Sequence, residues 1–144
     1  MTTIKHVTVR QALQQQQTGG ARYLDVRSIP EFEQGHPAGA MNIPLMLAGP
    51  MGLTPNPDFM RVFEAVFPKD AKLVVGCQVG GRSLRAVQLL EGAGYQHIVD
   101  QRAGFGGARD QSGRVLEPGW AAEKLPVETG NPAKRCYSDL AKSK

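Results

Sequence analysis

One short segment sets the architecture expected of this chain: Val74-Val75-Gly76-Cys77-Gln78-Val79-Gly80-Gly81-Arg82-Ser83. It begins in an apolar run, Leu73 to Gly76, that is typical of a strand buried on both faces of a parallel sheet. A helical pattern starts at Ser83, so the residues between form a loop that follows a strand and opens a helix. Ligands of parallel sheets bind beyond the carboxyl ends of the strands. The thiol of Cys77 and the guanidinium of Arg82 therefore stand where chemistry is expected.

Helices and strands alternate on both sides of this segment. Apolar periodicity, capping residues and the Gly and Pro positions predict helices near residues 8–13, 29–34, 57–67 and 83–91, and strands near 23–26, 40–43, 72–76 and 95–99. Thr8 is expected to cap the first helix and Asn56 the third, with Pro57 at its first position. Glycines and prolines over 48–57 predict a loop. This order predicts an α/β fold, a three-layer sandwich with a mostly parallel central sheet of about five short strands.

The composition is that of a globular protein. The 144 residues are 41% hydrophobic and 21% charged, which excludes a disordered chain and indicates one domain. No apolar run reaches the ~18 residues of a membrane span, and the N-terminus lacks the apolar core of a secretory signal. We therefore expect a cytoplasmic protein without membrane contact. The net charge of +4 favours small anionic substrates, and the scattered basic residues predict no nucleic-acid binding.

The two cysteines, Cys77 and Cys136, lie 59 positions apart. They are too sparse for a disulfide framework and too few for an all-cysteine zinc site. We expect two free thiols in a reducing compartment, with no metal and no cofactor. Residues 130–144 are polar, so Cys136 is expected to be an exposed thiol in a flexible tail.

The loop favours an ionised thiol. Gly80 and Gly81 permit backbone conformations that point several N–H groups inward, as in an anion-binding nest. The following helix adds the partial positive charge of its N-terminus, Ser83 is expected to cap that end, and Arg82 adds a full charge. Thiols in such settings have pKa values of about 3.5–7.5, against about 8.5 for a free cysteine. The loop thus predicts that Cys77 is a nucleophile with an anion bound beside it.

Two other interpretations use the same residues. A lone cysteine is often a small buried hydrophobe, but a position between a buried strand and Gly-Gly-Arg-Ser is a poor place to hide an apolar side chain. The phosphate-loop motif G-x-x-x-x-G-K-[ST] is nearly matched by Gly76, Gly81, Arg82 and Ser83, with arginine in place of lysine. No strand-end carboxylate is clearly placed to hold magnesium, although Asp25 could be argued. Nucleotide hydrolysis is therefore disfavoured.

Together with motifs on either side, the loop resembles that of the single-domain rhodaneses, a family of thiosulfate sulfurtransferases. The motifs are Leu24-Asp25-Val26-Arg27, Glu31-Phe32, Gly35-His36, Gly39-Ala40 and Asn42-Ile43-Pro44 before the loop, Cys77 to Ser83 within it, and Gly94-Tyr95, Gly106-Gly107, Trp120 and Leu125-Pro126-Val127-Glu128 after it. The resemblance covers residues 5–129 and implies a rhodanese domain there, followed by the polar tail over 130–144.

The resemblance implies a reaction in two halves. Cys77 attacks the outer sulfur of thiosulfate, sulfite leaves, and the persulfide passes its terminal sulfur to a thiol or protein acceptor, or to cyanide in an assay. The residues that would bind the persulfide and the leaving anion are Gln78, Val79, Gly80, Gly81, Arg82 and Ser83. Asp25 and Arg27 would lie close to this loop and brace it through ion pairing, and His36 would be structural.

Loop size distinguishes related chemistries within the resemblance. Four residues separate Cys77 from Arg82, as in sulfurtransferases, whereas five mark the wider loop of related phosphatases and arsenate reductases, which are the less favoured alternative. A sulfur-carrier or binding module, loaded by a partner protein, is the main alternative. The sequence departs from the family pattern at Pro37, at the long segment 108–119, and at Lys124, which stands where glycine is usual.

Overall fold

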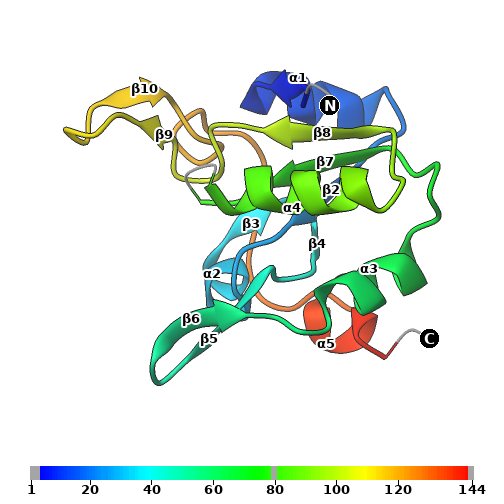
Figure 1. Cartoon of the computed structure of the whole chain (residues 1–144). Coiled ribbons are helices and arrows are strands. Elements are labelled where there is room, and N and C mark those ends of the chain that lie inside the picture. The colour runs from blue at the N-terminus through cyan, green and yellow to red at the C-terminus, as the bar shows by residue number, and fades with distance from the viewer. Residues whose placement is uncertain (1–3, 79–80, 143–144) are drawn as a thin grey trace.

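A computed structural model describes residues 4–78 and 81–142 (Figure 1). The elements follow in the order β1 (His6–Val7), α1 (Val9–Gln17), β2 (Arg22–Asp25), α2 (Ile29–Gln34), β3 (His36–Pro37), β4 (Met41–Asn42), β5 (Met46–Gly49), β6 (Gly52–Pro55), α3 (Phe59–Val66), β7 (Leu73–Gly76), α4 (Gly81–Gly92), β8 (Ile98–Gln101), β9 (Ala108–Arg109), β10 (Val115–Glu117), β11 (Val127–Glu128) and α5 (Tyr137–Leu140). Within the described chain, no helix has the length and apolar character needed to cross a lipid bilayer.

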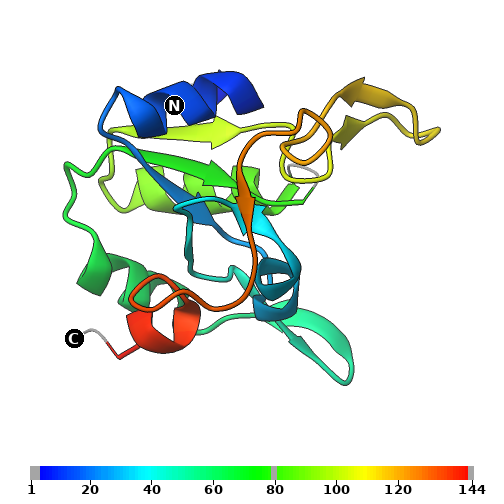
Figure 2. The same ribbon diagram turned by 180° about the vertical axis from the view of Figure 1, so that it is seen from behind.

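Five strands form the central sheet in the order β1-β8-β7-β2-β4, and every neighbouring pair is parallel. Helices cover both faces: residues of α3 and α4 pack in one core and residues of α1 in another (Figures 1 and 2). Short antiparallel pairs, β3–β11, β5–β6 and β9–β10, lie around the sheet. The α/β fold with a parallel central sheet, predicted from the alternation of elements, is therefore confirmed.

The register of the sheet divides the interior into these two cores. β2 and β7 pair Tyr23 with Val74 and Leu24 with Val75, and successive residues of a strand point to opposite faces. Tyr23 and Val74 lie in the core that includes α1, whereas Leu24 and Val75 lie in the core that includes α3 and α4. Each of the four is at most 1% exposed, which explains why the strand sequences are continuously apolar.

The region before α3 differs from the sequence prediction. The helix begins at Phe59 rather than at Pro57, because the Asn56 side chain accepts a hydrogen bond from the Asp58 backbone N–H at 3.0 Å and forms a turn there. The predicted loop over 48–57 contains most of a hairpin, in which β5 and β6 pair antiparallel. Gly49, Gly52 and Pro55 lie within these two strands, and Pro50 lies in the connection between them.

The edge of the sheet also differs. β8 begins at Ile98, three residues later than expected, and Tyr95 precedes it as a buried core residue. β1 is not predicted at all, because a strand of two residues carries no readable periodicity. It pairs with β8 so that His6 stands opposite Asp100.

The C-terminal segment is packed over its described residues, 130–142. Cys136 and Leu140 are each 5% exposed, and Leu140 belongs to the core that includes α3 and α4. Arg135 forms an ion pair with Glu128 of β11. The expectation of an exposed Cys136 is therefore wrong, since composition does not reveal the apolar face of this segment. The flexibility of residues 130–144 stays a prediction. The position of the domain boundary stays a prediction.

Candidate active site

The predicted loop lies at the carboxyl edge of the sheet. β7 is the middle strand and ends at Gly76, Cys77 follows directly, and α4 begins at Gly81. The carboxyl end of a central parallel strand and the N-terminus of a helix thus converge near the thiol, as the sequence predicts. Val79 and Gly80, two of the predicted anion-binding residues, lie outside the described residues.

The thiol of Cys77 is buried. The residue is 2% exposed and belongs to the core that includes α3 and α4. The expectation that this position would not bury a side chain is therefore wrong. The sulfur nevertheless has a polar neighbour, because its S–H donates to the Ser83 hydroxyl oxygen at 3.6 Å. The site combines apolar surroundings with a hydroxyl at the sulfur.

Ser83 has a different role from the helix cap predicted for it. It is the third residue of α4 and fully buried, and its hydroxyl donates to Oδ1 of Asp100 at 2.6 Å. Oδ2 of Asp100 lies 2.9 Å from Nδ1 of His6. Burial raises the pKa of Asp100, against the opposing hydrogen bonds from Ser83 and His6. Neither Asp100 nor His6 is marked by any motif, so sequence analysis missed both.

Arg82 does not present a free charge to an anion. Its guanidinium donates to both carboxylate oxygens of Glu31, at 2.7 and 2.9 Å. Partial burial raises the pKa of Glu31, but the hydrogen bonds from Arg82 and Ser28 outweigh it and lower the pKa to about 2. Arg82 therefore ties the start of α4 to α2. The partial positive charge at the N-terminus of α4 is a further source of positive potential near the loop.

Asp25 and Arg27 occupy the bracing position that the family resemblance implies. Both are at most 2% exposed, and Nη2 of Arg27 donates to Oδ2 of Asp25 at 2.8 Å. Arg27 also donates to the Gln78 side chain at 3.0 Å and to the Gly35 carbonyl oxygen at 2.6 Å, and its guanidinium lies 4.5 Å from the centroid of the Phe105 ring. One buried arginine thus links β2, the end of α2 and the active loop.

A glycine-rich segment after β8 supports the loop from another side. Backbone N–H groups of Phe105 and Gly106 donate to the carbonyl oxygens of Cys77 and Gln78, at 2.7 and 2.8 Å. Gly104 has a φ of +70°, and a Cβ there would lie 2.6 Å from each of those carbonyl oxygens. Gly106-Gly107 is among the motifs that carry the family resemblance, but no local pattern shows which residues this segment touches.

His36 has structural surroundings, as the resemblance implies. It is fully buried and stacks on Phe32 with 3.6 Å between ring centroids. Its ring nitrogens lie 2.6 Å from the Phe32 carbonyl oxygen and 3.1 Å from a carboxylate oxygen of Glu128. These contacts join α2 to β11.

A cavity of about 470 Å³ lies beside the loop. It is lined by Arg27, Glu31, Gln34, Gly35, Gln78 and Phe105. Its volume suits a small molecule. Both charged residues that line it are already paired, Arg27 with Asp25 and Glu31 with Arg82.

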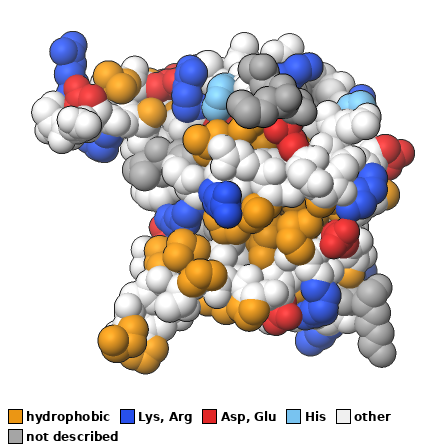
Figure 3. All heavy atoms as spheres, viewed as in Figure 1, with side chains coloured by type: hydrophobic (Ala, Val, Ile, Leu, Met, Phe, Trp, Pro, Cys, Tyr) orange, Lys and Arg blue, Asp and Glu red, His pale blue; other side chains and the backbone are white. Residues whose placement is uncertain are grey.

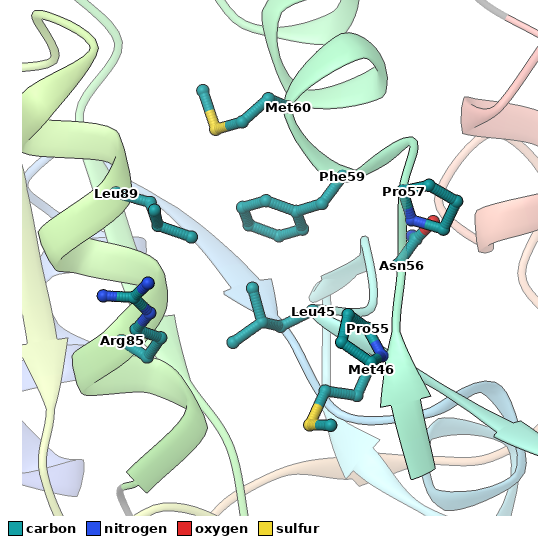
Figure 4. Close-up of a pocket in the computed structure, with 9 residues that line it drawn as sticks. All are labelled: Leu45, Met46, Pro55, Asn56, Pro57, Phe59, Met60, Arg85 and Leu89. Carbon is teal, nitrogen blue, oxygen red and sulfur yellow. The ribbon is translucent and has the colours of Figure 1, made fainter.

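A second cavity, of about 410 Å³, is apolar and lies between the β5–β6 region, α3 and α4 (Figure 4). It is lined by Leu45, Met46, Pro55, Asn56, Pro57, Phe59, Met60, Arg85 and Leu89. Apolar side chains also gather between α4 and α3 on the face shown in Figure 3. No described residue of the active loop lines this cavity.

Comparison with known proteins places this architecture in a family. The sequence profile of the rhodanese-like domain matches residues 8–109. Thiosulfate sulfurtransferase 16, chloroplastic, from Arabidopsis thaliana is 38% identical over 109 residues, which are 76% of this chain and 81% of that protein. Protein HIGH ARSENIC CONTENT 1, mitochondrial, from the same plant is also 38% identical over 109 residues, covering 76% of this chain and only 60% of that protein.

A solved structure shows the same fold at lower identity. The crystal structure of Rv0390 from M. tuberculosis superposes with a TM-score of 0.72 and 24% sequence identity, covering 90% of this chain and 100% of that one. The rhodanese-like domain profile matches most of this chain, and the chain shares 38% identity with the two Arabidopsis relatives. The chain therefore belongs to the family of rhodanese-like domain proteins.

Proposed function

We propose that the protein is a thiosulfate sulfurtransferase that carries the transferred sulfur as a persulfide on Cys77. The observation that supports this most is the placement of Cys77 between the end of the central strand β7 and the N-terminus of α4. The spacing of four residues to Arg82 and the identity to a relative named as a thiosulfate sulfurtransferase point the same way.

In the proposed reaction, the Cys77 thiolate attacks the outer sulfur of thiosulfate. The sulfur–sulfur bond of thiosulfate breaks, sulfite leaves with the bonding electron pair, and Cys77 holds a persulfide. An acceptor thiolate, or cyanide in an assay, then attacks the terminal sulfur, and the Cys77 thiolate is the leaving group. Sulfite and thiolate leave as anions, so the loop needs no general acid. Backbone N–H groups of residues 78–82 would hold the negative charge.

Intact mass spectrometry tests this function. Incubation with thiosulfate should add one sulfur, about 32 Da, and release sulfite, and Cys77→Ser should abolish both because it lacks the nucleophile. Cys136→Ser is the matched control, since it changes the other buried thiol and should still load sulfur. Turnover that survives in Cys77→Ser would contradict the proposal. Turnover of an aryl phosphate would instead favour the phosphatase alternative.

A sulfur carrier loaded by a partner protein is the second candidate. The observation that favours it is that Cys77 is 2% exposed while both nearby arginines are paired with carboxylates. A small anion therefore meets few unpaired cations at this site. Loading from thiosulfate and from a cysteine desulfurase should be compared: faster loading by the desulfurase identifies a carrier.

We further propose a cytoplasmic location, where the thiols stay reduced.

A further inference from the structure

A series of polar contacts leads from the Cys77 thiol to the protein surface. Sγ of Cys77 donates to Oγ of Ser83 at 3.6 Å, and Oγ of Ser83 donates to Oδ1 of Asp100 at 2.6 Å. Oδ2 of Asp100 lies 2.9 Å from Nδ1 of His6. Ser83 and Asp100 are at most 1% exposed, whereas the His6 side chain keeps 34% of its surface exposed. A hydroxyl and a carboxylate thus connect a buried thiol to solvent.

The sheet register places these groups on one face. His6 stands opposite Asp100 in the β1–β8 pair, and Asp100 stands opposite Val75 in the β7–β8 pair. Residues opposite each other point to the same face, and Cys77 follows Val75 by two positions, which returns it to that face. The same face is covered by α4, whose first turn supplies Ser83. The arrangement is therefore built into the fold and does not depend on one flexible side chain.

We propose that Ser83 relays the proton of the Cys77 thiol to the buried carboxylate of Asp100. When the thiol ionises, its proton passes to Oγ of Ser83 while the hydroxyl proton of Ser83 passes to Oδ1 of Asp100. The products are a thiolate that accepts a hydrogen bond from Ser83 and a neutral carboxylic acid. One negative charge is buried before and after the step, so no additional charge is desolvated. This inference rests on the proposed role of Cys77 as nucleophile.

The surroundings of Asp100 make it a suitable proton acceptor. Burial raises the pKa of its carboxyl group, so it binds a proton more readily than an exposed aspartate. The groups that act on it are His6 from β1, Arg102 just after β8, and Ser83 from α4, and each of them favours the carboxylate. A protonated His6 therefore opposes the relay and a neutral His6 permits it.

A purely electrostatic role for Asp100 predicts the opposite result. A fixed carboxylate near the sulfur disfavours the thiolate, so its removal in Asp100→Asn would make Cys77 more reactive. In the relay, Asn cannot accept the proton, so the same change makes Cys77 less reactive. The direction of the change in Cys77 reactivity therefore distinguishes the relay from the electrostatic role. A merely structural contact would not produce such a change.

The experiment follows alkylation of Cys77 by iodoacetamide across pH, read by mass spectrometry of the peptide that carries it. Asp100→Asn and Ser83→Ala should each slow alkylation near about pH 6 by roughly tenfold and move the profile about one unit toward higher pH. Ser83→Thr keeps a hydroxyl and should retain most of the reactivity. His97→Gln, which alters an exposed histidine outside the relay, should leave the profile unchanged.

Faster or unchanged alkylation in Asp100→Asn, with native circular dichroism, overturns the relay. If Asp100→Asn fails to fold, the comparison of Ser83→Ala with Ser83→Thr decides: equal rates overturn the relay and a rate difference supports it. Sulfur loading from thiosulfate is measured on the same samples. A wild-type protein that shows the expected profile but gains no sulfur contradicts the proposed function and not the relay.

Discussion

Gly104 is held against the active loop in a backbone conformation that L residues with a Cβ rarely adopt. Its φ is +70°, and the carbonyl oxygens of Cys77 and Gln78 leave no room for a methyl group. Lys124 shows the complementary case. Its φ of 57° lies in the left-handed region that favours glycine, so Lys124 carries backbone strain although its side chain is exposed.

Gly104→Ala is expected to lower the melting temperature and slow persulfide formation on Cys77. The backbone strain costs about 1–3 kcal/mol, and the contact at 2.6 Å adds displacement of the loop carbonyls. Gly113→Ala is the matched control, because Gly113 also has a positive φ, of +88°, but nothing lies near its Cβ position. Differential scanning fluorimetry and sulfur loading measure the two effects. Equal losses in both variants would show that the contact is unimportant.

At the scale of elements, the Arg82–Glu31 pair joins the first turn of α4 to α2. Glu31 also accepts hydrogen bonds from the backbone N–H and the hydroxyl of Ser28, at the start of α2. The Glu31 carboxylate thus caps α2 and also holds α4, the helix that follows Cys77. This explains why the arginine of the motif stabilises the loop even though its charge is already neutralised.

The pH dependence of this pair has a definite sign. The folded protein lowers the pKa of Glu31 from 4.5 to about 2, so the pair stabilises the fold above the ordinary pKa and loses that contribution as pH falls toward 2. Glu31→Gln should therefore lower the melting temperature near neutral pH, and the difference should disappear near about pH 2. Glu64→Gln, which breaks an exposed pair with Lys69, should change little at either pH. If the difference in melting temperature between wild type and Glu31→Gln persisted unchanged in acid, it would contradict the stabilising role of the Arg82–Glu31 ion pair.

At the scale of the whole molecule, the C-terminal segment completes one of the two cores. Leu140 of α5 packs with residues of α3 and α4, and Arg135 binds Glu128, which also accepts a hydrogen bond from the Gly39 backbone N–H. Residues near the end of the sequence therefore support the layer that covers Cys77. Over its described length, the segment after residue 130 buries Cys136 and Leu140.

Leu140→Ala should reduce the free energy of unfolding by about 2 kcal/mol or more, because it removes buried apolar contacts and leaves a cavity. Lys142→Ala changes an exposed residue two positions later and should stay within about 0.5 kcal/mol of wild type. Urea unfolding monitored by circular dichroism compares them. Similar stabilities for the two variants would show that the segment unfolds independently of the core.

The sequence by itself determined the alternation of elements, the parallel sheet and the position of Cys77 directly after a strand buried on both faces. Those features follow from local patterns: apolar runs of strand length, helical spacing and glycines that end elements. The placement of Asp25 and Arg27 beside the loop was implied by the family resemblance of the motif that contains them. The bounds of short elements such as β1 were not, since two residues carry no period.

Only the tertiary structure decided what each reactive group touches. His6 meets Asp100 across 94 positions, Arg82 meets Glu31 across 51, and Gly104 lies against the loop through contacts that no spacing reveals. Burial of Cys77 and packing of Leu140 also depend on how the layers close over the sheet. The physical reason is that local propensity sets each element, whereas strand register and long-range packing set which side chains become neighbours.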